Sequence, residues 1–142
     1  MGRTADRGLR LPAALGLAGL AGLTLGFSPA VDYAVHCQGC HLADGSATPG
    51  SVPALAGSVG ALARTPSGRA YLVQVPGVAH APLDDRELAV LLNWVVARFG
   101  GTGAVPGFEP YSGEEVGRLR AEPLLDVEAA RRRALSAAPP PR

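Results

Sequence analysis

The segment VHCQGCHLADG, residues 35–45, constrains this chain more than any other, because it contains both of the chain's cysteines. Cys37 and Cys40 are three positions apart, and His41 follows directly. A pair at this spacing can form a disulfide, a redox dithiol, part of a zinc site or a haem attachment site. The rest of the sequence has to discriminate among these four uses.

Length and composition bound the fold around this motif. The 142 residues allow one domain of ordinary size. Nineteen glycines and thirteen prolines indicate a loop-rich chain, while a hydrophobic fraction of 47% still permits a compact core. Aromatic residues are few, and a small fold of this kind often takes part of its core from a cofactor or a staple.

The N-terminus has the three-part pattern of an export signal over residues 1–30. Residues 1–10 are polar and net positive, residues 11–27 carry no charge, and small residues follow at Ser28 and Ala30. The alternative is a retained membrane anchor, weakened by four glycines and a proline in the apolar stretch. The SPA tripeptide can also be interpreted as a helix start, with Ser28 as N-cap and Pro29 in first position.

The charge balance disfavours nucleic acid as a partner. The formal net charge is +1, but Arg3, Arg7 and Arg10 outweigh Asp6 in the first thirty residues. The remaining chain is therefore about one unit negative and lacks the basic field that attracts nucleic acid. Membrane association is expected only through the N-terminal segment.

The four chemistries of the motif make different demands. A disulfide across two residues closes too small a loop to stabilise much, and a redox dithiol needs a helix where LADGSATPGSVP has glycine and proline breakers. Zinc would need His36 as a fourth ligand, crowded beside the three motif side chains. Haem c attachment needs two thiols within reach of the two porphyrin vinyl groups and a histidine that ligates iron from the same side. CQGCH supplies that spacing, so haem attachment is the favoured interpretation.

At these residues the sequence resembles the class I c-type cytochromes. The resemblance covers roughly residues 31–99: a short helix ending in VHCQGCH, an LADG turn, VPALAG about twelve residues later and a final amphipathic helix. HCQGCH and YLVQVPGVAHAPL are also similar to a subgroup of small periplasmic cytochromes encoded beside oxidative enzymes. The resemblance implies an all-α cytochrome c-like fold of short helices and loops wrapped around one covalent haem.

The resemblance also implies roles for individual residues. Cys37 and Cys40 would form the thioethers of one haem c, His41 would be the proximal ligand, and the Pro53 carbonyl would accept a hydrogen bond from the His41 ring. The partners would be exported redox proteins of the periplasm, such as a quinoprotein dehydrogenase or a terminal oxidase.

The sixth iron ligand departs from the family pattern, which is methionine. The chain's one methionine is Met1, at the head of the export segment. His36 lies on the segment that carries the proximal ligand, on the wrong side of the porphyrin. His80 lies thirty-nine residues beyond His41, in a Gly- and Pro-containing loop four residues before Asp84. We therefore expect His80 as the sixth ligand, with an open distal position as the alternative.

The helix signals divide the chain into residues 1–30, a haem domain at 31–101 and a helical extension at 102–142. The strongest helix begins at Asp84, forms a capping box with Glu87 and ends at the glycines 100 and 101. Shorter helices are predicted at 54–65 and at 67–75, the latter capped by Ser67. In the extension, Ser112 with Glu115 predicts a capping box, Asp126 caps a helix, and residues 138–142 form a disordered tail. Arg131–Arg133 are expected on a solvated helix face.

Two functions remain open at this stage. The first is an electron-transfer protein and not an enzyme, since no second catalytic constellation is visible and the acidic pairs are explained as helix starts. The second is a haem protein with an open distal site, acting as a small-ligand sensor or in a peroxidase-like reaction. The identity of the sixth ligand separates them.

Overall fold

Helices and loops alone make up the part of the chain that the computed structural model describes, which is residues 1–2, 28–101, 105–122 and 124–138. The helices are α1 (Pro29–His36), α2 (Val59–Leu62), α3 (Pro66–Gln74), α4 (Pro76–Ala79), α5 (Asp85–Phe99), α6 (Gly113–Arg120) and α7 (Val127–Ala137). An isolated antiparallel bridge joins His41 to Ala47. The predicted all-α class is therefore confirmed for these ranges.

The predicted export segment, residues 1–30, lies largely outside the described residues, because residues 3–27 are not among them. Helix α1 begins at Pro29, with Ser28 in the N-cap position but without a side-chain cap bond. The SPA tripeptide thus forms the start of a helix in this structure. Among the described residues, no helix has the length and apolarity needed to cross a bilayer.

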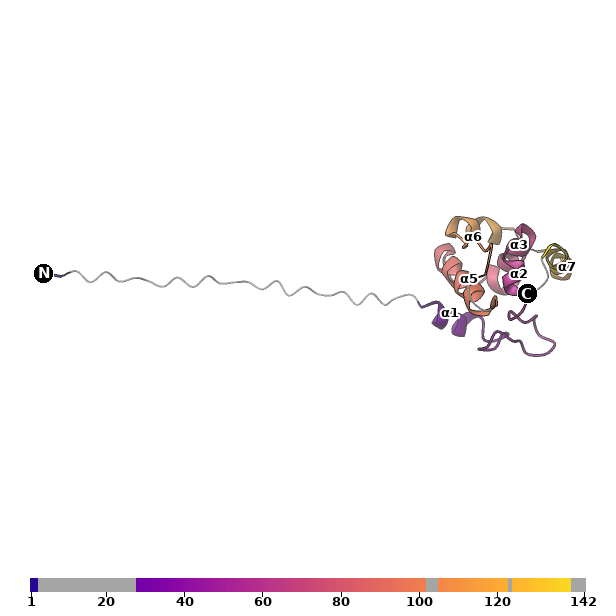
Figure 1. Ribbon diagram of the computed structural model, residues 1–142, viewed down its shortest axis with the longest axis horizontal. Helices are drawn as coiled ribbons and strands as arrows, with labels where there is room; N and C mark the ends of the chain where they lie inside the picture. The colour runs from indigo at the N-terminus through magenta and orange to yellow at the C-terminus, as the bar shows by residue number, and fades with distance from the viewer. Residues whose placement is uncertain (3–27, 102–104, 123, 139–142) are drawn as a thin grey trace.

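Helix α5 packs against three other helices, α1, α2 and α6. Its predicted capping box is confirmed: the Glu87 amide donates to Asp84 Oδ1 at 2.8 Å, and the Asp84 amide donates to Glu87 Oε2 at 2.9 Å. The helix ends at Gly100 as predicted. The sequence predicts an amphipathic helix here, and the apolar residues along one stripe of it are buried: Leu88, Leu91, Leu92, Val95 and Phe99. One face of α5 is therefore part of the core, and Figure 1 shows the helix lying between α1 and α6.

Helix α1 packs on α5 through an aromatic cluster, defined here as Tyr33, Trp94 and Phe99. The Tyr33 ring centroid lies 5.4 Å from that of Trp94 and 5.2 Å from that of Phe99, in tilted arrangements. Trp94 and Phe99 meet edge to face at 5.8 Å. Tyr33 is only 1% exposed, so this contact fixes α1 against α5.

The two middle helices differ from their predicted bounds. Helix α3 is capped by Thr65, whose hydroxyl oxygen accepts from the Gly68 amide at 3.1 Å, and not by Ser67. Pro66 explains the shift, because proline is favoured at the first helical position. Only Val59–Leu62 of the predicted 54–65 helix is helical. Gly57 stands before it with φ +80°, a conformation that ends rather than continues a helix.

The predicted loop that carries His80 is partly ordered into a single helical turn, α4. Pro76 opens this turn and His80 caps its C-terminus. The His80 amide donates to the Pro76 carbonyl, and the Ala81 amide donates to the Val78 carbonyl. The remaining residues lead irregularly to the Asp84 cap of α5, as the sequence predicts.

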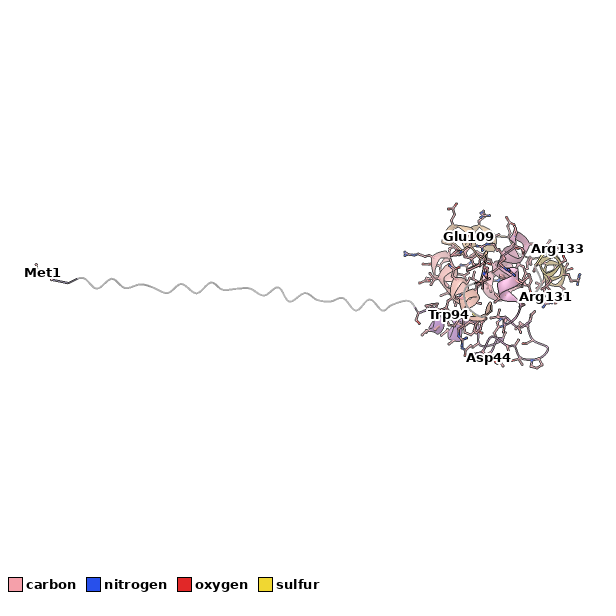
Figure 2. The ribbon with its side chains drawn as sticks, viewed as in Figure 1. Met1, Asp44, Trp94, Glu109, Arg131 and Arg133 are labelled. Atoms are coloured by element: carbon pink, nitrogen blue, oxygen red, sulfur yellow. The ribbon has the colours of Figure 1, made fainter. Side chains whose placement is uncertain are left out.

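Helices α6 and α7 share the apolar core of the preceding residues. Helix α6 packs on α5 and α3, and α7 packs on α3, with Val116, Ala130 and Ala134 buried in the common cluster. Asp126 caps α7 as predicted, accepting from the Ala129 amide at 2.8 Å. Arg132 and Arg133 are exposed and Arg131 is half-buried, and Figure 2 shows the labelled pair Arg131 and Arg133 at the α7 edge. Of the predicted disordered tail, residues 139–142 lie outside the description.

The Ser112 capping box forms only in one direction, because Glu115 has a stronger partner. Ser112 accepts from the Glu115 amide at 3.1 Å, but the Glu115 carboxylate binds Arg69 of α3 in a bidentate pair at 2.8 and 2.6 Å. Arg69 also donates to the Glu109 carbonyl at 2.6 Å and lies 4.0 Å over the Tyr111 ring. This ion pair ties α6 to α3.

Glycines allow two close approaches in the core. Gly60 of α2 faces the backbone of Gly100, and a Cβ at position 60 would overlap the Gly100 carbonyl. Gly45 has φ +78°, and its carbonyl accepts the amides of Leu55 and Ala56 at 2.8 and 3.0 Å. A Cβ at position 45 would lie 2.5 Å from the Phe99 ring. Each glycine brings a loop or helix directly onto the end of α5.

Gly45→Ala is expected to lower the free energy of unfolding by about 2–3 kcal/mol, because it adds overpacking against Phe99 to the strain of a positive φ. Gly50→Ala is the matched control, since Gly50 has φ +79° but open space around its Cβ position. The control should cost about 1 kcal/mol, the strain alone. Urea unfolding of both haem-loaded variants measures the difference, and equal losses would contradict the packing argument.

Glu115→Gln is expected to lower the unfolding free energy at neutral pH by about 1–2 kcal/mol. The Arg69 hydrogen bonds hold the pKa of Glu115 below its ordinary value of 4.5. The stabilisation by the ionised carboxylate is therefore complete above pH 4.5 and is lost as pH falls through the lower folded-state pKa. Unfolding curves in a pH series should converge in acid, whereas Glu114→Gln, an exposed neighbour, should match the parent throughout.

Candidate haem-binding site

The CQGCH motif forms a tight turn at the C-terminal end of α1. Cys37 is the C-cap residue, and its amide donates to the Tyr33 carbonyl at 2.9 Å. The amides of Cys40 and His41 both turn back to the Cys37 carbonyl, at 3.2 and 2.9 Å. The three predicted attachment residues therefore lie on one turn, which begins four residues after the buried Tyr33.

The loop after the motif is closed by its own hydrogen bonds. The Leu42 amide donates to the Ser46 carbonyl at 2.8 Å, next to the bridge between His41 and Ala47. Asp44 accepts from both the amide and the hydroxyl of Ser46, at 2.9 and 2.7 Å, and these bonds lower its carboxyl pKa. Figure 2 shows Asp44 on the side of the molecule away from Glu109 of the segment before α6. The LADG segment is thus a defined turn.

Tyr33 connects the motif loop to the core. Its hydroxyl donates to the Leu42 carbonyl at 2.7 Å, while its ring belongs to the aromatic cluster on α5. Burial is the main reason that the pKa of Tyr33 is raised, so the hydroxyl keeps its proton and remains a donor. The residue after His41 is therefore held by a side chain of the fixed helix.

The two thiols differ in their surroundings. Cys37 is half-buried, Cys40 is exposed, and both are free thiols in this structure. Burial, with a smaller effect from Asp32, raises the pKa of Cys37 to about 11. The Cys37 thiol is thus protonated and uncharged at neutral pH, so its partial burial costs no desolvation of a charge.

His41 has the properties of a ring that lacks a partner. Its Nδ1 is buried without a hydrogen bond, and burial lowers the pKa of the ring, which favours the neutral imidazole that a metal requires. The predicted bond to the Pro53 carbonyl is not formed in this structure, and Pro53 is exposed. A buried polar atom without a partner is unfavourable. Two thiols and a neutral imidazole on one turn fit a covalently bound haem.

His80 lies on a different segment, and its ring is bonded to its own turn. Nδ1 of His80 is 2.9 Å from the Pro76 carbonyl, and the residue is exposed. In the described ranges, no group of three or more His, Cys, Asp or Glu side chains is gathered as a metal would require. The structure therefore brings Cys37, Cys40 and His41 together and leaves His80 on the separate loop after α4. His36 is half-buried at the end of α1.

Sequence reasoning missed the side chain that holds the His80 loop. Arg120, in the last turn of α6, donates to backbone carbonyls on both sides of His80. No local motif signals such a contact, because its acceptors are backbone atoms about forty residues away. A hollow at the surface is lined by Arg69, Glu109 and Glu115 and includes none of the predicted haem residues.

This geometry defines a small helical protein with a haem attachment turn at the end of its first helix, and the comparisons with known proteins agree. No family model matches the chain. A cytochrome c-552 of Thermus thermophilus is 33% identical over 123 residues, which cover 74% of this chain and 83% of the relative. Another cytochrome c-552 of the same species is 35% identical over 106 residues, covering 62% of this chain and 81% of the relative.

The chain belongs to the c-type cytochromes. It is a small monohaem cytochrome with covalently attached haem c, and its function lies in electron transfer. The predicted family, cofactor and all-α fold are thereby confirmed.

Tyr33→Phe is expected to lower the unfolding free energy by about 1–2 kcal/mol, because the ring contacts stay while the Leu42 carbonyl loses its donor. In this variant the amide hydrogens of the motif loop should also exchange faster than in the parent, whereas those of the rest of the chain should not. Tyr111→Phe is the control, since the Tyr111 hydroxyl makes only a 3.4 Å contact with the Arg69 carbonyl. Hydrogen exchange that is equally fast in both variants would contradict the anchoring role of Tyr33.

Proposed function

We propose that this cytochrome is an exported carrier of single electrons, with His41 as the proximal ligand and His80 as the sixth. The haem would be attached through Cys37 and Cys40. Its partners would be other exported redox proteins of the periplasm, of the dehydrogenase or terminal oxidase kind. The bound haem supplies a reversible one-electron Fe(III)/Fe(II) couple, and the chain's own residues hold it and set its surroundings.

The observation that carries the proposal is the hydrogen bond of the His80 ring. When Nδ1 holds its proton toward the Pro76 carbonyl at 2.9 Å, Nε2 bears the free lone pair. Histidines that ligate metals usually donate their other ring N–H to a carbonyl or carboxylate, which fixes the tautomer and the ring orientation. In that tautomer, the α4 turn leaves Nε2 of His80 free for the role of an axial ligand, which supports the assignment.

The absence of an alternative in the sequence supports the same assignment. Met1 is the only methionine, and it lies at the far end of the predicted export segment. His36 lies on the helix that leads into the proximal motif, four residues before Cys40. His80 is the remaining histidine, on a loop that lies between two proline residues, Pro76 and Pro82, and just before α5. A bis-histidine site has a lower reduction potential than the usual His/Met site.

Exposed apolar side chains surround the attachment motif, which supports a contact surface for redox partners there. Val31 and Val35, one turn apart on α1, are 58% and 67% exposed, and Leu42 is 45% exposed. Cys40 of the attachment turn is also exposed. Short-lived complexes between redox proteins use small interfaces. We therefore place the electron-exchange surface at α1 and the motif turn.

His80→Ala tests the proposal by EPR and visible spectroscopy, after haem staining of a denaturing gel has shown covalent attachment. The parent should give a low-spin bis-histidine spectrum, and the variant a high-spin one, because an axial ligand is lost. His36→Ala is the control and should leave the low-spin spectrum unchanged. A parent that is already high spin and insensitive to His80→Ala would rule out the ligand assignment. It would favour instead an open distal site with small-ligand or peroxide chemistry.

A further inference from the structure

The side chain of Arg120 holds the loop that carries His80. Nε and Nη2 donate to the Ala79 carbonyl at 3.1 and 2.8 Å, Nη2 donates to the Ala81 carbonyl at 3.0 Å, and Nη1 donates to the Leu83 carbonyl at 2.9 Å. The carbonyls of Ala79 and Ala81 belong to the residues immediately before and after His80. Nη1 also pairs with the Asp85 carboxylate at 3.2 Å.

This contact is suited to fixing an irregular backbone. A guanidinium is planar and carries its donors in a rigid fork, so several acceptors must occupy set positions at once. The Arg120 side chain is only 19% exposed, so water replaces its bonds poorly. The three carbonyls are spaced two residues apart, and one side chain therefore restrains the whole path from α4 to α5.

Helix α6 in turn is held firmly at its other end. The Glu115 carboxylate is bound to Arg69 of α3, and Val116 is fully buried against the core. Gly117 leaves room for the Asp85 carboxylate, since a Cβ there would overlap it. Arg120 is thus anchored on a fixed helix, while the segment that it holds is short and irregular.

We propose that Arg120 is a positioning residue, which fixes the backbone of residues 79–83 and thereby the location of the His80 ring. Its consequence for the iron rests on the proposed function of His80. The C-terminal helices would then influence the distal side of the haem through a side chain that is not itself an iron ligand. The α4 turn orients the ring, and Arg120 holds the turn in place.

The test compares Arg120→Ala, Arg120→Lys, His80→Ala and the control Arg118→Ala in the haem-loaded full chain. Arg118 is an exposed residue of the same helix with the same charge, and its side chain makes no hydrogen bond within the described part of the chain. Hydrogen exchange by mass spectrometry reports on residues 76–84 and, separately, on α5. EPR and the reduction potential report on the iron.

In Arg120→Ala, exchange in residues 76–84 should rise about tenfold while α5 stays close to the parent. The low-spin signal should become partly high spin and the potential should shift. Lysine should restore these properties only in part, because one ammonium cannot reproduce the fork. Arg118→Ala should match the parent in every measurement. In a His80→Ala background, Arg120→Ala should no longer change the spin state.

Three results would overturn the positioning role. In the first, residues 76–84 of Arg120→Ala exchange as slowly as in Arg118→Ala. In the second, exchange rises equally in α5, which means general destabilisation. An unchanged spin state in Arg120→Ala, where His80→Ala does change it, would also overturn the role. If His80→Ala leaves the spectrum unchanged, the ligand assignment fails, and the exchange of residues 76–84 alone decides on Arg120.

Discussion

The contact of Tyr33 with α5 is the interaction on which the rest of the structure depends. Its ring joins α1 to Trp94 and Phe99, and its hydroxyl holds the loop that follows the haem attachment turn. Gly45 places the far side of that loop on the same Phe99 ring. In a chain with few aromatic residues, one cluster therefore sets the positions of α1, α5 and the CQGCH turn together.

Two arginines complete the fold by binding loops instead of packing in the core. Arg69 connects α3 with the segment that enters α6, and Arg120 connects the end of α6 with the segment that enters α5. Both use backbone carbonyls that no helix satisfies, together with one carboxylate each. The hydrophobic core brings the helices together, and these polar bonds then select one path for the connections between them.

The features that are predictable from the sequence are those with local causes. The Asp84–Glu87 capping box, the Asp126 cap and the apolar stripe of α5 are set by neighbouring residues, and the motif is identified by its spacing. Thr65 escapes prediction because Ser67 is an equally good cap by residue type, and only the position of Pro66 separates them. The sequence places Glu115 in a local capping box, although its partner, Arg69, is forty-six residues away. Arg120 is not predictable because its acceptors are backbone atoms, which leave no mark in the sequence.

The backbone contact of Gly60 with Gly100 has a consequence for how such a chain can diverge. Neither residue has a functional side chain, and neither adopts a positive φ. A Cβ at position 60 would overlap the backbone of Gly100, so a side chain there would have to push α2 away from the end of α5. A Cβ at position 100 would overlap the Val96 carbonyl and the Val105 side chain before it reached Gly60. Substitutions should therefore be common on the exposed faces of α6 and α7 and rare at these two positions. These two residues have no functional side chain, yet substitutions at them would be as restricted as those at a cofactor ligand.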